Sequence, residues 1–118
     1  AFGHSVAEKV TLGDDRVRLV AALQRTAGTA RILIMNGGLG PTQDDLTAEL
    51  VAAAAGVELA LHPEADKHVR DWCTARSIEP NDANLKQAWL PEGAAIIHNP
   101  RGSAVGFAAM AGLTGGVY

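Results

Sequence analysis

The sequence predicts an α/β domain with a mostly parallel sheet covered by helices on both faces. Short runs rich in valine and isoleucine alternate with segments of helical period, and this order favours right-handed crossovers between parallel strands. Apolar residues make up 47% of the chain but aromatic residues only 4%, so the core must be built from small aliphatic side chains. Layers of helix and sheet suit such side chains, and we expect a three-layer α/β/α fold.

The first half of the chain is expected to run strand, helix, strand. Residues 5–12 (SVAEKVTL) alternate loosely and fit a strand, after which Asp14 can cap a helix. From Asp15 to Ala27 the apolar residues fall on one side of a 3.6-residue period, which predicts a helix packed on the sheet. Residues 31–36 (RILIMN) form a continuous apolar run, the pattern of a strand buried on both faces.

The second half is expected to contain three helices and two short strands. Residues 46–55 predict a helix that ends at Gly56, and a second helix begins at Pro63 and runs to Arg76. Its first turn is acidic and its end is basic, as the helix dipole prefers. Three further elements are expected: a short helix after Pro80 that closes at Pro91, and strands at residues 94–98 and 107–110.

Length and charge limit the possible partners. The 118 residues fit a single domain, and a formal net charge of −3 with interspersed signs argues against nucleic acid as a partner. The single cysteine cannot form an internal disulfide, and neither a signal peptide nor a long apolar run is found. We therefore expect a cytoplasmic protein that binds small molecules and contacts no membrane.

A glycine-rich segment, MNGGLGPTQDDLT, lies between a predicted strand and a predicted helix. Gly37, Gly38 and Gly40 can adopt positive φ and let a ligand approach the backbone closely. Such a turn offers amide donors and the positive end of a helix dipole, which together attract phosphate. The alternative is a structural turn in which Thr42 caps the helix. The pattern is neither G-x-G-x-x-G nor a P-loop, because no Lys-Ser/Thr pair follows.

Two adjacent carboxylates, Asp44 and Asp45, follow these glycines. A phosphate about 4 Å from one of them would be repelled by roughly 4 kcal/mol at an effective dielectric near 20. Dipole complementation, the structural alternative for both aspartates, is worth only about 1 kcal/mol. A bound phosphate therefore needs a divalent cation such as Mg²⁺, Mn²⁺ or Co²⁺, or the carboxylates face ribose hydroxyls or a pterin N–H edge.

Further motifs accompany the glycine segment in a fixed order. They are VTLGDDR, NGGLGPTQDDLTAE, HPEA, NLKQAWLPEGA and NPRGSAVGF. Together they resemble the molybdopterin-binding-like domain of MoaB, MogA and gephyrin-type proteins, and most closely the amino-terminal domain of the competence-damage-inducible CinA family. The resemblance covers nearly the whole chain. It implies a three-layer α/β/α domain with the ligand over the glycine segment.

The resemblance also implies an activity. CinA-type proteins are associated with metal-dependent hydrolysis of ADP-ribose to AMP and ribose 5-phosphate, and we expect this activity first. In the MogA branch the same site binds molybdopterin and adenylylates it, which is the alternative. A non-catalytic nucleotide-binding module is the third possibility.

The resemblance assigns roles to individual residues. The three glycines would cradle phosphate beside Thr42, and Asp44 and Asp45 would be the catalytic and metal-binding carboxylates. The remaining ligand-binding candidates are Asn84, Lys86, Asn99, Gly102 and Ser103. The alternatives for these five are a solvated helix face and a simple turn. Asp14 and Asp15 would either reach the same rim or only cap a helix.

The chain departs from the family pattern in several places. Asn36 stands where Thr is expected, and GSAVG replaces GTAPG. The family's first strand and helix with a GxEL motif, and its closing strand with an LPGxP loop, are not found, so we expect a domain incomplete at both ends. The deamidase domain of full CinA proteins is likewise not found, and nicotinamide mononucleotide deamidation is not expected.

Histidine, cysteine and tryptophan give no further site. The histidines at positions 4, 62, 68 and 98 lack metal-ligand spacing, so no zinc site is expected. Cys73 lies on an apolar stripe beside Trp72, which predicts a buried, inert thiol. Trp72 and Trp89 are expected as core or interface anchors. An exposed Trp89 would indicate a subunit contact, consistent with the homo-oligomer that we expect.

Overall fold

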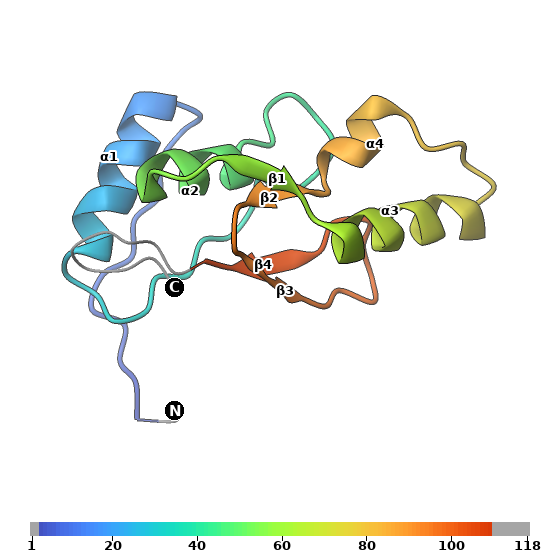
Figure 1. Ribbon diagram of the computed structural model, residues 1–118. Coiled ribbons are helices and arrows are strands. Elements are labelled where there is room, and N and C mark those ends of the chain that lie inside the picture. Colours follow the sequence, from blue (N-terminus) through green and yellow to red (C-terminus); the bar gives the residue numbers. More distant parts are fainter. Residues whose placement is uncertain (1–2, 110–118) are drawn as a thin grey trace.

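The computed structural model describes residues 3–109, which form helices around two small sheets (Figure 1). The elements are α1 (Arg16–Ala27), α2 (Thr47–Ala55), β1 (Leu59–Leu61), α3 (Pro63–Ala75), α4 (Asp82–Lys86), β2 (Trp89–Pro91), β3 (Ala95–Ile97) and β4 (Gly106–Ala108). The α1 and α2 helices lie side by side at one end of the molecule, and α3 and α4 lie at the other end. The two sheets lie between these pairs of helices.

The predicted helices form, and their ends follow local chemistry. Asp15, not Asp14, caps α1, because its side chain accepts a hydrogen bond of 3.1 Å from the Arg18 amide. Gly56 ends α2 in the left-handed conformation, as predicted. Pro63 occupies the first turn of α3, where its missing N–H costs nothing.

Both sheets have two antiparallel strands, so the predicted parallel sheet is wrong for the described residues. β1 pairs with β2 and β3 pairs with β4, and the mixed α/β class is confirmed. β1 was not predicted, and β2 occupies part of the segment expected to be helical up to Pro91. β3 falls within the predicted strand 94–98. The predicted last strand is found as β4, which begins one residue earlier than predicted and ends at Ala108; Met110 lies outside the described residues.

The strands predicted at residues 5–12 and 31–36 are also wrong. Both segments are irregular, and among residues 3–109 their backbone groups find no hydrogen-bond partner. In the second segment Leu33 and Met35 pack on a buried cluster, whereas the Ile32 and Ile34 side chains are 53% and 86% exposed. A strand requires a second strand to pair with its amides and carbonyls, and an apolar run alone cannot supply it.

Two buried clusters hold the fold together. The first joins α1 and α2 through Leu23, Leu50 and Val51. The second lies under β2 and includes Ala65, Ala88, Leu90, Ala94 and Val105. Phe107 packs against both clusters and Ala48 of α2 against the second, so α2 is fixed from two sides. This position matters because the glycine-rich segment leads directly into α2.

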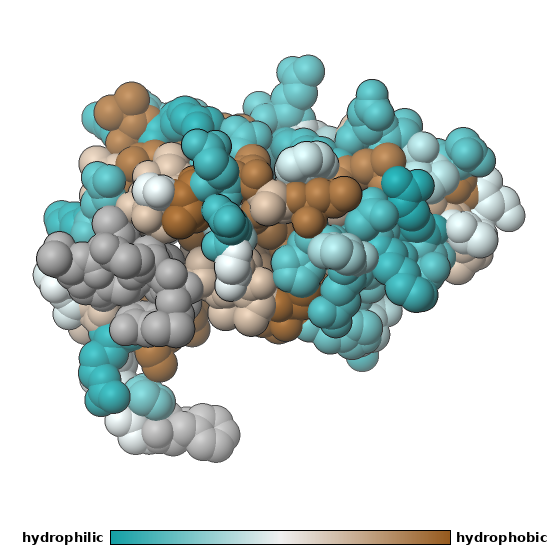
Figure 2. Space-filling model, in the orientation of Figure 1, coloured by the Kyte–Doolittle hydropathy of each residue, from teal (hydrophilic) through white to brown (hydrophobic). Residues whose placement is uncertain are grey.

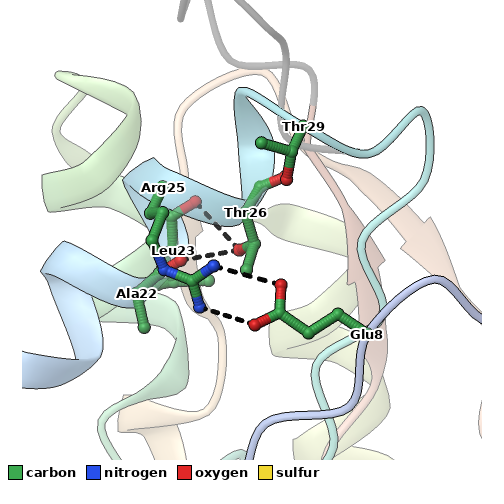
Figure 3. Close-up of polar contacts among 6 residues, drawn as sticks. All are labelled: Glu8, Ala22, Leu23, Arg25, Thr26 and Thr29. Atoms are coloured by element: carbon green, nitrogen blue, oxygen red, sulfur yellow. Dashed lines mark hydrogen bonds and ion pairs between the residues drawn. The ribbon is translucent and has the colours of Figure 1, made fainter.

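The segment before α1 is held by an ion pair instead of a sheet. The Arg25 guanidinium donates two hydrogen bonds, of 3.1 and 2.9 Å, to the Glu8 carboxylate (Figure 3). This contact lowers the pKa of Glu8 and raises that of Arg25. Beside it the Thr26 hydroxyl donates to the Ala22 carbonyl within α1. Each helix in the described part of the chain falls short of what a bilayer crossing requires in length and apolar character.

Candidate functional site

The first glycine loop, residues 36–45, is tied to the start of α2 by its carbonyl groups. The Thr47 hydroxyl donates a 2.6 Å hydrogen bond to the Gly37 carbonyl, and the Thr47 amide donates a 3.0 Å bond to the Gly38 carbonyl. Thr47 is buried, so water does not compete strongly for these bonds. The loop is therefore fixed at its centre.

Glycine is required at the centre of this loop. Gly37 and Gly38 have φ values of 100° and 68°, a region that side chains rarely adopt. A Cβ at Gly38 would also collide with the Thr47 hydroxyl. The prediction of a permissive turn is confirmed, and the close approach of Thr47 explains why one of these glycines cannot be replaced.

Three successive amides at the centre of this loop have no partner among the described residues. Within residues 3–109 the N–H groups of Gly37, Gly38 and Leu39 donate to no acceptor. The carbonyls of the same turn are already bonded to Thr47. Anchored carbonyls and unbonded amides are the arrangement that an anion-binding turn needs.

Asp45 stabilises the loop instead of pointing an unengaged carboxylate at a ligand. Its Oδ2 accepts hydrogen bonds of 2.7 Å from the Thr42 hydroxyl and 2.9 Å from the Thr42 amide. The Thr42 hydroxyl bond is the main cause that lowers the pKa of Asp45, partial burial opposes it, and the amides of Thr42 and Gly40 and the charge of Lys86 lower it further. A Cβ at Gly40 would lie 2.7 Å from the same oxygen, so a side chain there would displace the Asp45 carboxylate.

This contact corrects the structural role predicted for Thr42. Thr42 does not cap α2, because Leu46 occupies the N-cap position and makes no side-chain bond. Asp44 is exposed and has no hydrogen-bond partner in the described part of the chain. Nowhere in that part do three histidine, cysteine or acidic side chains gather as a metal cluster. Mg²⁺ usually keeps several waters and takes one or two protein carboxylates plus substrate phosphate, so it does not require a cluster of three side chains.

Lys86 joins the far end of the domain to this loop. Its Nζ donates 2.6 and 2.7 Å hydrogen bonds to the carbonyls of Thr42 and Asp45. An ammonium group has three N–H donors, so one remains for a ligand. A cleft of about 40 Å³ opens between α2, β2 and the loop. Its lining includes Gly38, Leu39, Gly40, Asp45, Glu49, Lys86, Gln87 and Trp89.

The other helix candidate, Asn84, has a local role. Its amide donates to the Asn81 side chain at 2.9 Å, and its side-chain oxygen accepts from the Asn81 amide at 3.1 Å. This reciprocal cap starts α4 and accounts for the Asn84 side-chain oxygen. Asn84 is also absent from the lining of the cleft.

The second glycine loop, residues 99–105, is fixed by side chains. Asn99 donates to the Ala104 carbonyl at 2.8 Å and accepts from the Arg101 amide at 3.1 Å. The His68 ring makes a 2.8 Å hydrogen bond to the Gly102 carbonyl. Ser103 donates to the side chain of Gln87 at 2.8 Å, and Gln87 lines the cleft. The second loop therefore reaches the wall of the cleft through one buried glutamine.

The first turn of α1 reaches this site only indirectly. Asp14 and Asp15 do not line the cleft, and Asp15 is occupied as the helix cap. Arg16 forms a 3.0 Å ion pair with Glu49, which does line the cleft. The capping alternative is therefore the one that the structure favours for Asp15.

Sequence reasoning missed several residues of the site. Thr47, Gln87 and Glu49 gave no signal, because their roles depend on contacts between distant segments. Trp89 was considered only as an anchor, yet its side chain is 46% exposed and lines the cleft. Cys73 is buried, as predicted.

Known proteins match this chain over almost its full length. The family model described as a probable molybdopterin binding domain matches residues 1–116. A CinA-like protein from Colwellia psychrerythraea is 52% identical over 106 residues, which cover 90% of this chain and 24% of that protein. A CinA-like protein from Shewanella amazonensis is 44% identical over 105 residues, covering 89% and 25% respectively. The chain thus spans about a quarter of the length of these relatives.

A solved structure matches as well. The crystal structure of the protein CinA, with unknown function, from Thermoplasma acidophilum superposes with a TM-score of 0.85 at 26% identity. The match covers 98% of this chain and 67% of that one. The resemblance to the CinA family is therefore confirmed in both sequence and fold.

Proposed function

Because this chain belongs to the family of probable molybdopterin binding domains, we propose that it binds a phosphate-bearing heterocyclic ligand at the first glycine loop. As the leading activity we propose CinA-type hydrolysis of the ADP-ribose diphosphate with a divalent cation. Hydrolysis would break one P–O bond of the diphosphate and add water across it.

One observation carries the proposal. The loop is anchored by its carbonyls to Thr47, while the amides of Gly37, Gly38 and Leu39 have no partner in the described part of the chain. Lys86 retains one N–H at the same loop after serving two carbonyls. Amides held in advance can stabilise charge on phosphate oxygens without having to reorganise.

The charges around the cleft explain why a cation belongs in the proposal. Asp45 and Glu49 both line it, and Glu49 is balanced by Arg16 at 3.0 Å. Since the pKa of Asp45 is lowered, this side chain is ionised at neutral pH. Asp44 and the second oxygen of Asp45 would hold the cation. The bound cation would neutralise phosphate charge and act as a Lewis acid on the diphosphate.

The alternative is a pterin-binding or adenylyl-transfer domain. The exposed carboxylate of Asp44 favours it, because a carboxylate accepts hydrogen bonds and a pterin edge donates them. Binding without turnover would correspond to the third possibility, a non-catalytic nucleotide-binding module.

Binding is tested first with inorganic pyrophosphate, which has the diphosphate and no ring. Calorimetry with and without Mg²⁺ should show binding that Lys86→Gln weakens by about tenfold, since a charged hydrogen bond is lost. Lys67→Gln is the matched control, because Lys67 pairs with Asp71 on the exposed side of α3. Equal losses of pyrophosphate affinity in the two variants would show that the anion does not bind at the first glycine loop.

Turnover is tested with ADP-ribose and Mg²⁺, Mn²⁺ or Co²⁺. AMP and ribose 5-phosphate are the expected products. Pyrophosphate binding without either product would defeat the hydrolase and leave the binding module. Tighter binding of a pterin phosphate than of ADP-ribose, again without product, would favour the alternative.

A further inference from the structure

Trp89 lies at the edge of the cleft. It is the first residue of β2, opposite Leu61 of β1, and the next residue of the strand, Leu90, is 2% exposed. Side chains alternate along a strand, so the burial of Leu90 directs the indole to the opposite side. The Trp89 side chain is 46% exposed and Leu61 is 47% exposed. Figure 2 shows apolar side chains reaching the surface above the β1 and β2 ladder.

The small size of the cleft indicates where the phosphate and the ring of a ligand would lie. The cleft is small, with a volume of about 40 Å³, so a purine or pterin ring would not be enclosed in it together with a phosphate group. A ligand whose phosphate lies at Gly38 and Lys86 must therefore leave its ring at the mouth of the cleft. Trp89 lines that cleft together with Gly38 and Lys86, and it is the half-exposed aromatic side chain there.

The other described aromatic side chains are engaged elsewhere. The Arg76 guanidinium lies 3.1 Å from the centre of the Trp72 ring on α3, so one face of that ring is covered. Phe107 packs against both buried clusters. Among the described residues, the half-exposed Trp89 ring makes no aromatic or cation–π contact of this kind.

We propose that Trp89 is the stacking surface for the planar nitrogen heterocycle of the ligand whose phosphate binds the first glycine loop. This inference rests on the proposed function and adds the recognition of the ring. Stacking on an aromatic face tolerates any flat heterocycle, so adenine and a pterin are both accommodated. Leu61 extends the apolar surface beside the indole.

The first test compares ligands with and without a ring. Trp89→Ala should weaken binding of ADP-ribose, or of neopterin phosphate, by about tenfold or more, the usual size of a base-stacking contribution. Affinity for inorganic pyrophosphate should stay within about twofold, because it has no ring to stack. Trp89→Tyr should retain most of the affinity for the ring-bearing ligands. Whichever ring compound shows the larger loss identifies the source of the heterocycle.

The second test measures the fluorescence of the Trp89 indole. The chain has two tryptophans, so Trp72→Phe leaves Trp89 as the sole tryptophan. ADP-ribose should quench its fluorescence at saturation, whereas pyrophosphate should leave it nearly unchanged. Trp72→Ala is the matched control for affinity and should bind ADP-ribose as the unsubstituted protein does.

Two results would overturn the inference without touching the proposed function. The first is an equal loss of affinity for pyrophosphate and ADP-ribose in Trp89→Ala. The second is unchanged ADP-ribose affinity with a lower oligomeric mass, which would make Trp89 a contact between copies of the chain. Absence of pyrophosphate binding in the unsubstituted protein would instead defeat the proposed function, and the stacking role with it.

Discussion

The two glycine loops differ in how they are anchored and in whether their glycines reach the cleft. In the first, residues 36–45, the carbonyls of Gly37 and Gly38 are bonded to Thr47, and the amides of Gly37, Gly38 and Leu39 have no partner in the described part of the chain. In the second, residues 99–105, Asn99 satisfies one amide and one carbonyl of its own loop. Both segments contain glycine and some amides without a partner among residues 3–109, but only the first loop has glycines that line the cleft.

The difference teaches that glycine content alone does not define a binding loop. A side chain that bonds the backbone of its own loop uses the groups that a ligand would need. A side chain that anchors only the carbonyls leaves the amides available. Thr47 anchors the first loop from α2, whereas Asn99 anchors the second from within the loop itself, and neither residue is a glycine.

The largest expected effect comes from Gly38→Ala. The new Cβ would meet the Thr47 hydroxyl in a left-handed conformation, so the free energy of unfolding should fall by about 2 kcal/mol or more. Pyrophosphate affinity should fall by at least about tenfold, as the amides lose their arrangement. Gly93→Ala is the matched control, because Gly93 has φ of 81° but open space around it. A Gly38→Ala protein that binds pyrophosphate normally would contradict the assignment of the first loop as the binding loop.

Thr47→Val should have the next largest effect. The substitution keeps the shape of the side chain but leaves the Gly37 carbonyl without its hydroxyl donor, which should cost about 1–2 kcal/mol in urea unfolding. Pyrophosphate affinity should also fall severalfold. Thr26→Val removes another buried threonine hydroxyl, bonded only within α1 (Figure 3), and should leave affinity unchanged. Equal binding losses in both variants would mean that Thr47 acts through general stability.

Gly102→Ala should destabilise the protein with little effect on binding. A Cβ there would lie 2.6 Å from the Asn99 amide nitrogen and displace its bond to Ala104, at a cost of about 1 kcal/mol. Pyrophosphate affinity should change less than about twofold, because the first loop keeps its anchors. A loss as large as that of Gly38→Ala would show that the second loop contacts the anion after all.

The smallest expected effect is a difference between the two loops in how the free energy of unfolding depends on pH. The lowered pKa of Asp45 means that its charge contributes stability above its ordinary value, near pH 4, and that this contribution is lost as pH falls through the lowered value. Unfolding of the wild type and Asp45→Asn should differ by less than about 1 kcal/mol above pH 5, and the difference should shrink toward pH 2. Ser103→Ala should show a pH-independent offset, since residues 99–105 contain no carboxylate. An Asp45→Asn difference that stays constant to pH 2 would contradict the assignment.

Local signals predicted the helices well. Gly56 and Pro63 mark a helix end and a helix start by backbone geometry alone, and both predictions are confirmed. The cap of α1 was misplaced by one residue, from Asp15 to Asp14, because two adjacent aspartates offer the same chemistry. Strands were harder, since pairing of β1 with β2 joins segments almost 30 residues apart, a separation that no local pattern encodes.

The candidate site was predicted in part for the same reason. The three glycines in one short segment predicted a turn that can adopt positive φ. Which of its atoms stay free depends on Thr47 and Lys86, and the latter reaches the loop from a separate helix. Lys86 was found through the family resemblance, whereas the exposure of Trp89 follows from β2 pairing and could not be read from its neighbours in the chain.

The reach of Lys86 has a consequence for the order in which the protein folds. Its hydrogen bonds to Thr42 and Asp45 span 44 and 41 residues, so they can form only after α3 and α4 have returned to the start of α2. Contacts of such long sequence separation carry a large chain-closure entropy and belong to late stages of assembly. A nascent chain that has emerged only as far as β1 would therefore have the glycine turn without the Lys86 ammonium group that bonds to it. Binding of the proposed ligand should therefore begin only once the segment carrying Lys86 is docked. Such binding would then report that folding is complete.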